Sequence, residues 1–138
     1  MRRDVPAWVS DYVGISYRPG GRTREQCDCW GLFALVLKEQ FGVSLEEYDG
    51  PMFQGRRDAQ AVGEAAAAFA ARFNQIEPGQ ERLGDGILIR MLGVPLHVAT
   101  VVAPGWMLHI EEACDAVVEN YRGRAWSGRL LGFYRVVA

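Results

Sequence analysis

The sequence predicts an α+β domain in which helices come first and antiparallel strands follow. Apolar residues recur at helical spacing before residue 42, and past Pro78-Gly79 the pattern changes to that of β-strands. Helical segments followed by a run of strands are typical of this fold class. The chain has 138 residues and is 49% hydrophobic, which is enough to bury one core. We therefore expect a single domain over residues 1–138.

The composition argues against several functional classes. The formal net charge is −2 and the arginines are scattered, so nothing indicates a nucleic-acid partner. No run reaches the roughly 18 apolar residues of a membrane span, and the N-terminus lacks the apolar segment of a signal peptide. Cys27 and Cys29 are too close for an easy mutual disulfide. We expect no membrane insertion, and synthesis in a reducing cytosol.

The chain begins with a short predicted helix and a turn. Val5–Val13 carries Trp8, Val9 and Tyr12 at helical spacing. Arg18–Gly21 is rich in proline and glycine, which is typical of a turn. This turn leads the chain to the segment that carries the candidate chemistry.

The segment from Gln26 to Gly42 predicts a buried helix. Asp28 is a good N-cap, and Gly42 can adopt the left-handed conformation that ends a helix. Cys29 then lies on the first turn, where unpaired N–H groups and the helix dipole favour a thiolate. Cysteines in such positions have lowered pKa values and are nucleophilic. The apolar positions that follow the helical period are 29, 32, 33, 36, 37 and 41.

The remaining elements are one more helix and five strands. Asp58 can cap an alanine-rich helix over Ala59–Phe73, for which we expect a packing role only. Ala103–Gly105 is a plausible three-residue hairpin loop with glycine in the left-handed position. The predicted strands are Gly86–Met91, Leu96–Val102, Trp106–Ile110, Val117–Tyr121 and Leu130–Val137.

The two histidines of the chain, His97 and His109, fall in the predicted hairpin. With a three-residue loop, His109 lies opposite Ala99, and His97 is its diagonal neighbour on the same face. Diagonal neighbours have Cβ atoms about 7–8 Å apart, so one ring can orient the other. A two-residue loop would change the parity and separate the rings. Trp106, Leu108 and Ile110 are expected on the opposite face.

These residues together suggest a catalytic triad in the general sense. Cys29 would attack a carbonyl carbon, and its backbone N–H would bind the oxyanion. His97 would hold the thiolate as an ion pair and later protonate the leaving amine. His109 would fix the position and tautomer of His97.

Other interpretations of the same residues remain open. A lone buried cysteine is usually inert, and a lone histidine in a strand is usually structural. A second alternative is a metal-stabilised binding module, although the Cys-x-Cys spacing is tighter than usual for zinc. Gly31 in the first helical turn suggests a close approach, plausibly of the strand that carries His97. The candidate zinc ligands are Cys27, Cys29, His97, His109 and Cys114.

Five segments, in this order, resemble motifs of the NlpC-type cell-wall peptidases, a papain-like cysteine peptidase family. Residues 14–21 are similar to the family's Gly-x-Pro-Tyr-x-x-Gly-Gly stretch, and Asp28-Cys29-Trp30-Gly31 resembles its Asp-Cys-Ser-Gly nucleophile motif. The other three matches are Gly84–Leu88 with a Gly-Asp-leading strand, His97-Val98-Ala99 with His-Val-Gly, and Met107–Ile110 with the strand of the third polar residue.

The resemblance implies a papain-like fold in which the nucleophile helix packs on an antiparallel sheet. It makes Cys29 the nucleophile, His97 the base and His109 the orienting residue. Tyr17 would lie beside the oxyanion and help to hold substrate, with Asp28 and Trp30 as the neighbouring oxyanion or substrate-binding positions. The implied substrate is a peptidoglycan stem peptide, commonly cut between γ-D-glutamate and a diamino acid. No metal or other cofactor is implied.

The chain departs from the family pattern at two positions, where Trp30 replaces serine and Ser16 replaces proline. Trp30 with the apolar helix behind it, and the Trp126–Arg135 stretch, resemble the branch encoded among phage tail-assembly and tail-tip genes. That branch implies tail-tip or baseplate hub partners, and delivery in a virion to the periplasm and cell wall. The alternatives are a structural tail component with the same fold and little catalysis, or a related amidase-type cysteine hydrolase. Trp8, Phe53 and Trp126 are the candidate apolar assembly residues.

Overall fold

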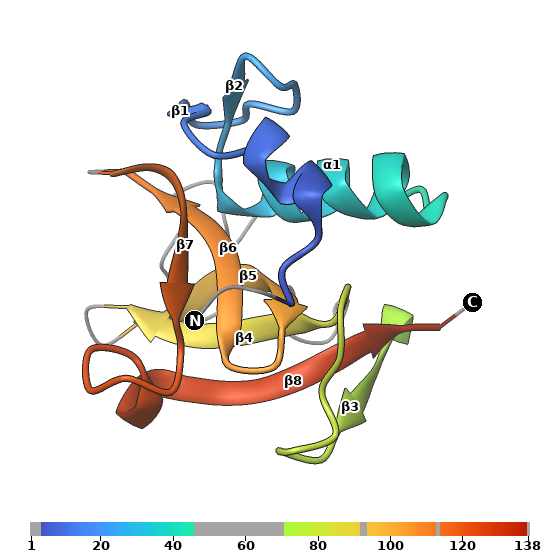
Figure 1. Ribbon diagram of the computed structural model, residues 1–138, viewed down its shortest axis with the longest axis vertical. Helices are drawn as coiled ribbons and strands as arrows, with labels where there is room; N and C mark the ends of the chain where they lie inside the picture. Colours follow the sequence, from blue (N-terminus) through green and yellow to red (C-terminus); the bar gives the residue numbers. More distant parts are fainter. Residues whose placement is uncertain (1–3, 46–70, 92–93, 113, 138) are drawn as a thin grey trace.

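The computed structural model describes residues 4–45, 71–91, 94–112 and 114–137. One helix, α1, packs on one face of a six-stranded antiparallel sheet, and a small two-stranded parallel sheet lies beside the start of α1 (Figure 1). The predicted α+β fold class, with the nucleophile helix on an antiparallel sheet, is confirmed. The elements are η1 (Ala7–Asp11), β1 (Ser16–Tyr17), β2 (Gln26–Cys27), α1 (Cys29–Phe41), β3 (Phe73–Ile76), β4 (Gly86–Met91), β5 (Val94–Ala103), β6 (Trp106–Glu111), β7 (Cys114–Asn120), η3 (Ser127–Arg129) and β8 (Leu130–Val136).

The strand order in the large sheet is β3-β8-β4-β5-β6-β7. Strands β4 to β7 follow one another as predicted, whereas β8 returns across the sheet to pair with both β4 and β3. The five predicted strands are confirmed with small shifts at their ends. No helix among the described residues has the length and apolar character needed to cross a membrane.

Two predicted helices need correction. The leading helix is a short 3-10 helix over Ala7–Asp11 rather than a longer segment, and its Val9 is buried. The alanine-rich helix cannot extend to Phe73, because Phe73 begins β3 and pairs with Val136. The rest of that predicted helix lies outside the described residues, apart from two helical residues directly before β3.

Helix α1 begins and ends where the sequence predicts. The Asp28 carboxylate accepts a hydrogen bond from the Gly31 N–H at 2.7 Å, and Gly42 ends the helix in the left-handed conformation with φ 69°. The same carboxylate accepts from the Gly20 N–H at 2.8 Å and from Arg22 at 2.7 Å. Asp28 therefore caps the helix and anchors the preceding loop to it at the same time.

Gly31 is needed because the loop before β2 lies against the first turn of α1. A Cβ on Gly31 would sit 1.9 Å from the carbonyl oxygen of Gly21, far inside van der Waals contact. The prediction of a close approach at Gly31 is thus confirmed. The predicted neighbour, the strand of His97, is wrong, because the loop anchored by Asp28 occupies this space.

The sheet separates two groups of buried side chains. Val98 and Leu108 face α1, whereas Ala99 and Met107 face the opposite side, as expected for residues that alternate along a strand. Trp106 and Ile110 lie with Leu108 on the α1 side, which confirms the prediction that they face away from His109. The group on the far side consists of Ile87, Ile89, Ala99, Val101, Met107, Tyr121, Trp126 and Phe133.

The β5–β6 hairpin differs from the prediction in its turn. Ala103 pairs with Trp106, so the loop has two residues, Pro104 and Gly105, and Gly105 has φ 90°. Proline followed by a left-handed glycine is typical of a type II turn. Farther from the turn, Thr100 pairs with Leu108, which is the register that a three-residue loop was predicted to produce. The register shift after Val101 adds one residue to β5, and this bulge restores the parity that the shorter turn would have reversed.

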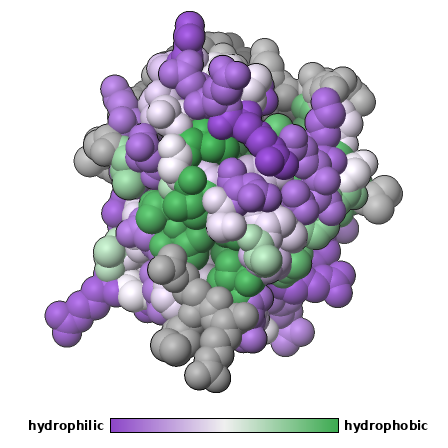
Figure 2. Space-filling model, turned by 45° about the horizontal axis from the view of Figure 1, so that its top comes forward, coloured by the Kyte–Doolittle hydropathy of each residue, from purple (hydrophilic) through white to green (hydrophobic). Residues whose placement is uncertain are grey.

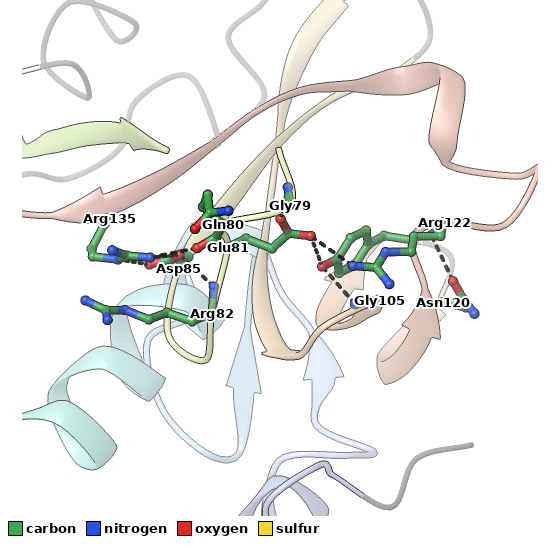
Figure 3. A network of polar contacts seen from close by, with 10 residues as sticks. Gly79, Gln80, Glu81, Arg82, Asp85, Gly105, Asn120, Arg122 and Arg135 are labelled. Atoms are coloured by element: carbon green, nitrogen blue, oxygen red, sulfur yellow. Dashed lines mark hydrogen bonds and ion pairs between the residues drawn. The ribbon is translucent and has the colours of Figure 1, made fainter. Parts of the chain in front are cut away.

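A buried polar network holds this turn in place (Figure 3). The Gly105 N–H donates to the hydroxyl of Tyr121 at 2.8 Å, and that hydroxyl donates to Glu81 at 2.6 Å. Glu81 also accepts from the Gly79 N–H at 2.6 Å and pairs with Arg122 at 3.5 Å. Burial raises the Glu81 pKa, but these hydrogen bonds outweigh it, so the net shift lowers the pKa. The network therefore ties the hairpin turn to the end of β7 and to the loop before β4.

We expect the Gly31→Ala substitution to destabilise the fold. Overpacking costs about 1–3 kcal/mol, which exceeds the gain of about 1 kcal/mol in helix propensity. The measurement is the free energy of unfolding in denaturant, with Gly128→Ala as the control, because a Cβ on Gly128 meets no atom within 4 Å. A Gly31→Ala protein as stable as the Gly128→Ala protein would contradict this account of the loop.

We expect Tyr121→Phe to lower the free energy of unfolding by about 1–3 kcal/mol, because it leaves the buried Gly105 N–H and Glu81 carboxylate short of a partner. The contact of the ring with Phe133, at 5.5 Å between centroids, is retained in this variant. Denaturant unfolding of Tyr121→Phe, Glu81→Gln and the double variant measures the coupling between the two side chains. Additive effects would show that the hydroxyl does not stabilise Glu81.

Candidate active site

Cys29 is the first residue of α1, and its side chain is almost fully buried, with 9% of its surface exposed. Its sulfur lies within hydrogen-bonding reach of three backbone groups, those of Val98, Trp30 and Cys29 itself. Two of these belong to the start of α1, as the capping pattern predicts. The third belongs to β5, at the residue that follows His97. The structure therefore brings the sulfur to the main chain of the histidine strand.

The pKa of Cys29 moves in the direction opposite to the prediction. Burial raises the pKa of the thiol to about 12, and the hydrogen bonds from Val98, Trp30 and Cys29 reduce this effect without reversing it. The helix start does stabilise a thiolate, but the loss of solvation is larger. In the free chain Cys29 is thus a neutral thiol at neutral pH.

His97 is also neutral in this environment. It is buried, and burial is the main reason that its pKa falls to about 3, with His109 and Arg129 as further causes. The predicted ion pair between a Cys29 thiolate and a His97 imidazolium is therefore wrong for the resting protein. A neutral imidazole can still act as a general base.

The two histidines meet as predicted, and the contact extends to a third residue. His97 Nε2 lies 2.8 Å from His109 Nδ1, and His109 Nε2 lies 2.5 Å from a carboxylate oxygen of Glu119. In the β6–β7 register Glu119 pairs with Met107 and His109 pairs with Val117, so Glu119 is the diagonal neighbour of His109. Three adjacent strands thus carry a continuous row of polar side chains.

Trp126 covers this row. Its ring stacks on His97 with centroids 6.2 Å apart and meets His109 edge to face at 4.9 Å. Arg129 lies over the Trp126 ring, with its guanidinium carbon 4.6 Å from the ring centroid. Trp126 is itself buried, so it shields the hydrogen bond between the histidines from water. This burial argues against Trp126 as one of the candidate assembly residues.

The other predicted site residues have different positions. Tyr17 is half-buried in β1. It pairs with Cys27 of β2, which lies two residues before Cys29. Asp28 is fully buried, and its carboxylate is occupied by backbone N–H groups and Arg22, so its role is structural. Trp30 packs on Phe33 with 1% of its surface exposed, which argues against a contact with substrate.

The remaining cysteines do not join the site. The Cys27 thiol is buried, donates a hydrogen bond to the Thr23 carbonyl at 2.9 Å, and has a pKa raised by burial to about 11. Cys114 is exposed on β7. Within the part of the chain that the structure describes, no group of three or more His, Cys, Asp or Glu side chains could hold a metal ion. The zinc alternative has no ligand set among these residues.

Glu119 and Trp126 are the contacts that sequence reasoning missed. The predicted strand over Val117–Tyr121 already contained Glu119, and the diagonal rule used for the histidines applies equally to β6 and β7. The diagonal pairing of Glu119 with His109 could therefore have been predicted, but only with the register of the β6–β7 hairpin. Trp126 could not be placed, because it lies in the irregular segment between β7 and β8.

Comparison with known proteins gives a consistent assignment. A model of the NlpC/P60 family matches residues 14–135. The Escherichia coli K12 protein named murein DD-endopeptidase MepS/murein LD-carboxypeptidase is 22% identical over 129 residues. This alignment covers 94% of the present chain and 60% of MepS, so the chain spans about three fifths of that relative.

Solved structures show the same fold. An NLP/P60-family protein from Staphylococcus aureus superposes with a TM-score of 0.66 at 21% identity, covering 94% of this chain and 39% of that protein. The NlpC/p60 domain of the peptidoglycan hydrolase SagA gives a TM-score of 0.61 at 20% identity, covering 96% and 94% of the two chains. The predicted papain-like NlpC-type fold is therefore confirmed.

We expect alkylation by iodoacetamide at pH 8 to modify Cys114 first and Cys29 slowly. Burial raises the pKa of the Cys29 thiol far above pH 8, so only a small fraction of Cys29 is a thiolate at that pH. The rate at Cys29 should therefore keep rising about tenfold per pH unit above pH 8. Peptide mass spectrometry measures each site, and a Cys114→Ser protein removes the competing signal. Fast labelling of Cys29 that levels off below pH 8 would show a resting thiolate instead.

Proposed function

Because the chain belongs to the NlpC/P60 family, we propose that it is a cysteine peptidase that hydrolyses amide bonds in peptidoglycan stem peptides. The observation that supports this most strongly is the junction between α1 and β5. There the Cys29 sulfur meets the amide next to His97, and His97 is in turn bonded to His109. A nucleophile at a helix start, a base and a group that orients the base are the parts that acyl transfer needs.

In the proposed mechanism the first step forms a thioester. The Cys29 sulfur attacks the amide carbon, and His97 accepts the thiol proton. Of the two His97 ring nitrogens, Nδ1 takes this proton, because Nε2 is already engaged by His109. The carbonyl oxygen becomes an oxyanion, for which the N–H groups at the start of α1 are suitable donors. His97 then protonates the leaving nitrogen, and the C–N bond breaks.

The second step releases the enzyme. A water molecule attacks the thioester carbon and gives its proton to His97. The C–S bond breaks, and Cys29 regains a proton as the carboxylic acid product leaves. Because the resting pair is neutral, His97 acts here as a general base rather than as the partner of a preformed thiolate.

For the scissile bond we propose the link between γ-D-glutamate and the diamino acid of the stem peptide. The name of MepS describes cleavage at other murein bonds, a DD-endopeptidase and an LD-carboxypeptidase activity. The masses of the products from defined muropeptides distinguish these possibilities. We further propose delivery by a phage tail tip in contact with hub proteins, a role suggested by the family branch that the sequence resembles.

A second candidate is a structural tail component that keeps the fold with little catalysis. The buried sulfur and its raised pKa favour it, because the resting protein holds no ready nucleophile. Figure 2 shows an apolar patch bordered by hydrophilic side chains on the face turned forward from the top of Figure 1. Of the residues predicted for assembly, Trp8 is half-buried and contacts Tyr12 and Phe41, and Phe53 lies outside the described residues.

We expect Cys29→Ala to abolish the release of new amino groups from purified peptidoglycan, with a loss of roughly 10³-fold or more. Cys114→Ala is the matched control and should keep wild-type activity. Circular dichroism and denaturant unfolding check that both proteins fold. An active Cys29→Ala protein would refute the nucleophile assignment. A wild-type protein that is inactive on all muropeptides between pH 5 and 9 would support the structural alternative.

A further inference from the structure

Glu119 ends the row of polar side chains that begins at His97. Its carboxylate lies 2.5 Å from His109 Nε2, and its side chain is 40% exposed, whereas the histidine side chains are almost fully buried. The row therefore has a buried end at His97, the residue before the Val98 backbone group that the Cys29 sulfur meets, and a carboxylate end at the surface of β7. No part of the mechanism above uses this carboxylate.

The protons along the row are determined by Glu119. An ionised carboxylate can only accept hydrogen bonds, so His109 Nε2 must carry the proton that it donates. A neutral His109 then has an unprotonated Nδ1, which can only accept. His97 Nε2, 2.8 Å away, must therefore carry a proton and donate it. A neutral His97 is left with an unprotonated Nδ1.

We propose that Glu119 is a positioning residue that fixes the tautomers of both histidines and so leaves His97 Nδ1 free to accept the proton of Cys29. This inference rests on the proposed peptidase function. Glu119 has no contact with the reacting atoms and acts through His109. Without it, His109 can carry its proton on Nδ1 and donate to His97 Nε2. His97 then carries its own proton on Nδ1, which is the wrong tautomer for the base in the proposed mechanism.

The same carboxylate also stabilises the protonated state of His97 during the reaction. Once His97 has taken a proton, the Nε2–H bond to His109 and the His109 bond to Glu119 connect the new positive charge to a negative one. Arg129, which disfavours a charge on His97, acts in the opposite sense. The hydrogen bond between the rings is shielded by Trp126, so the proton arrangement is protected from exchange with water.

The sequence makes a direct test simple, because the chain contains two histidines. Long-range ¹H–¹⁵N NMR of the free protein reports which ring nitrogen carries a proton. We expect both rings to be in the Nε2–H tautomer at pH 7. Two results would overturn the proposal. A His97 protonated on Nδ1 could not accept a proton there. A His109 protonated on both nitrogens would donate from Nδ1 to His97 instead of accepting from it.

Three variants separate this role from a structural one. Glu119→Leu removes the acceptor, and Glu119→Gln keeps an acceptor without the charge. Asp115→Leu is the control, because it removes an exposed carboxylate that lies four residues before Glu119 on the same strand. In Glu119→Leu we expect both rings to populate the Nδ1–H tautomer, with Glu119→Gln between it and the wild type and Asp115→Leu unchanged. If Glu119→Leu folds and keeps both rings in the Nε2–H state, the carboxylate does not set the tautomers.

Activity gives a second readout. In Glu119→Leu, kcat on a muropeptide should fall by roughly 10²-fold or more with little change in KM, because the base is lost rather than the substrate site. A rise in KM at constant kcat would argue for a contact with substrate instead. The NMR result does not depend on catalysis. An active Cys29→Ala protein would therefore refute the proposed function, whereas the tautomer assignment would still be decided by the NMR result.

Discussion

The hydrogen bond between His97 and His109 depends on one constraint, that both rings lie on the same face of the sheet. The parity of β5 against β6 decides this, and a single residue more or less between them would reverse it. A two-residue turn and a bulge after Val101 together produce the required register. The Tyr121 hydroxyl, held by Glu81, in turn fixes the turn at Gly105. A polar network distant from Cys29 therefore supports the site.

Burial governs the electrostatics of the site more strongly than the helix start does. The amides near the Cys29 sulfur favour a thiolate, yet burial leaves the thiol protonated, and burial also leaves His97 neutral. A neutral pair avoids the cost of two desolvated charges in the free chain. In the mechanism proposed above, charge develops only when a substrate carbonyl is present, and Glu119, bonded to His109, stabilises that charge.

The elements of the fold were largely predictable because each has a local cause. Asp28 and Gly42 mark the two ends of α1, and the alternation of apolar residues identified β4 to β8. The packing partner of Gly31 was not predictable, since the position of the Gly21 loop depends on tertiary contacts such as the hydrogen bond from the Gly20 N–H to the Asp28 carboxylate. Likewise the pKa of Cys29 depends on how many atoms surround the sulfur, which no spacing in the sequence reveals.

The sequence alone determined the helix with Cys29 on its first turn and the pair of histidines in one hairpin, since caps, periodicity and strand alternation act over a few residues. The tertiary structure decided which neighbours complete them. It added the bulge that preserves the register, Trp126 over the two rings, and Glu119 at the end of the polar row. These contacts join segments whose relative position depends on the packing of the whole sheet, and for that reason only the folded chain defines them.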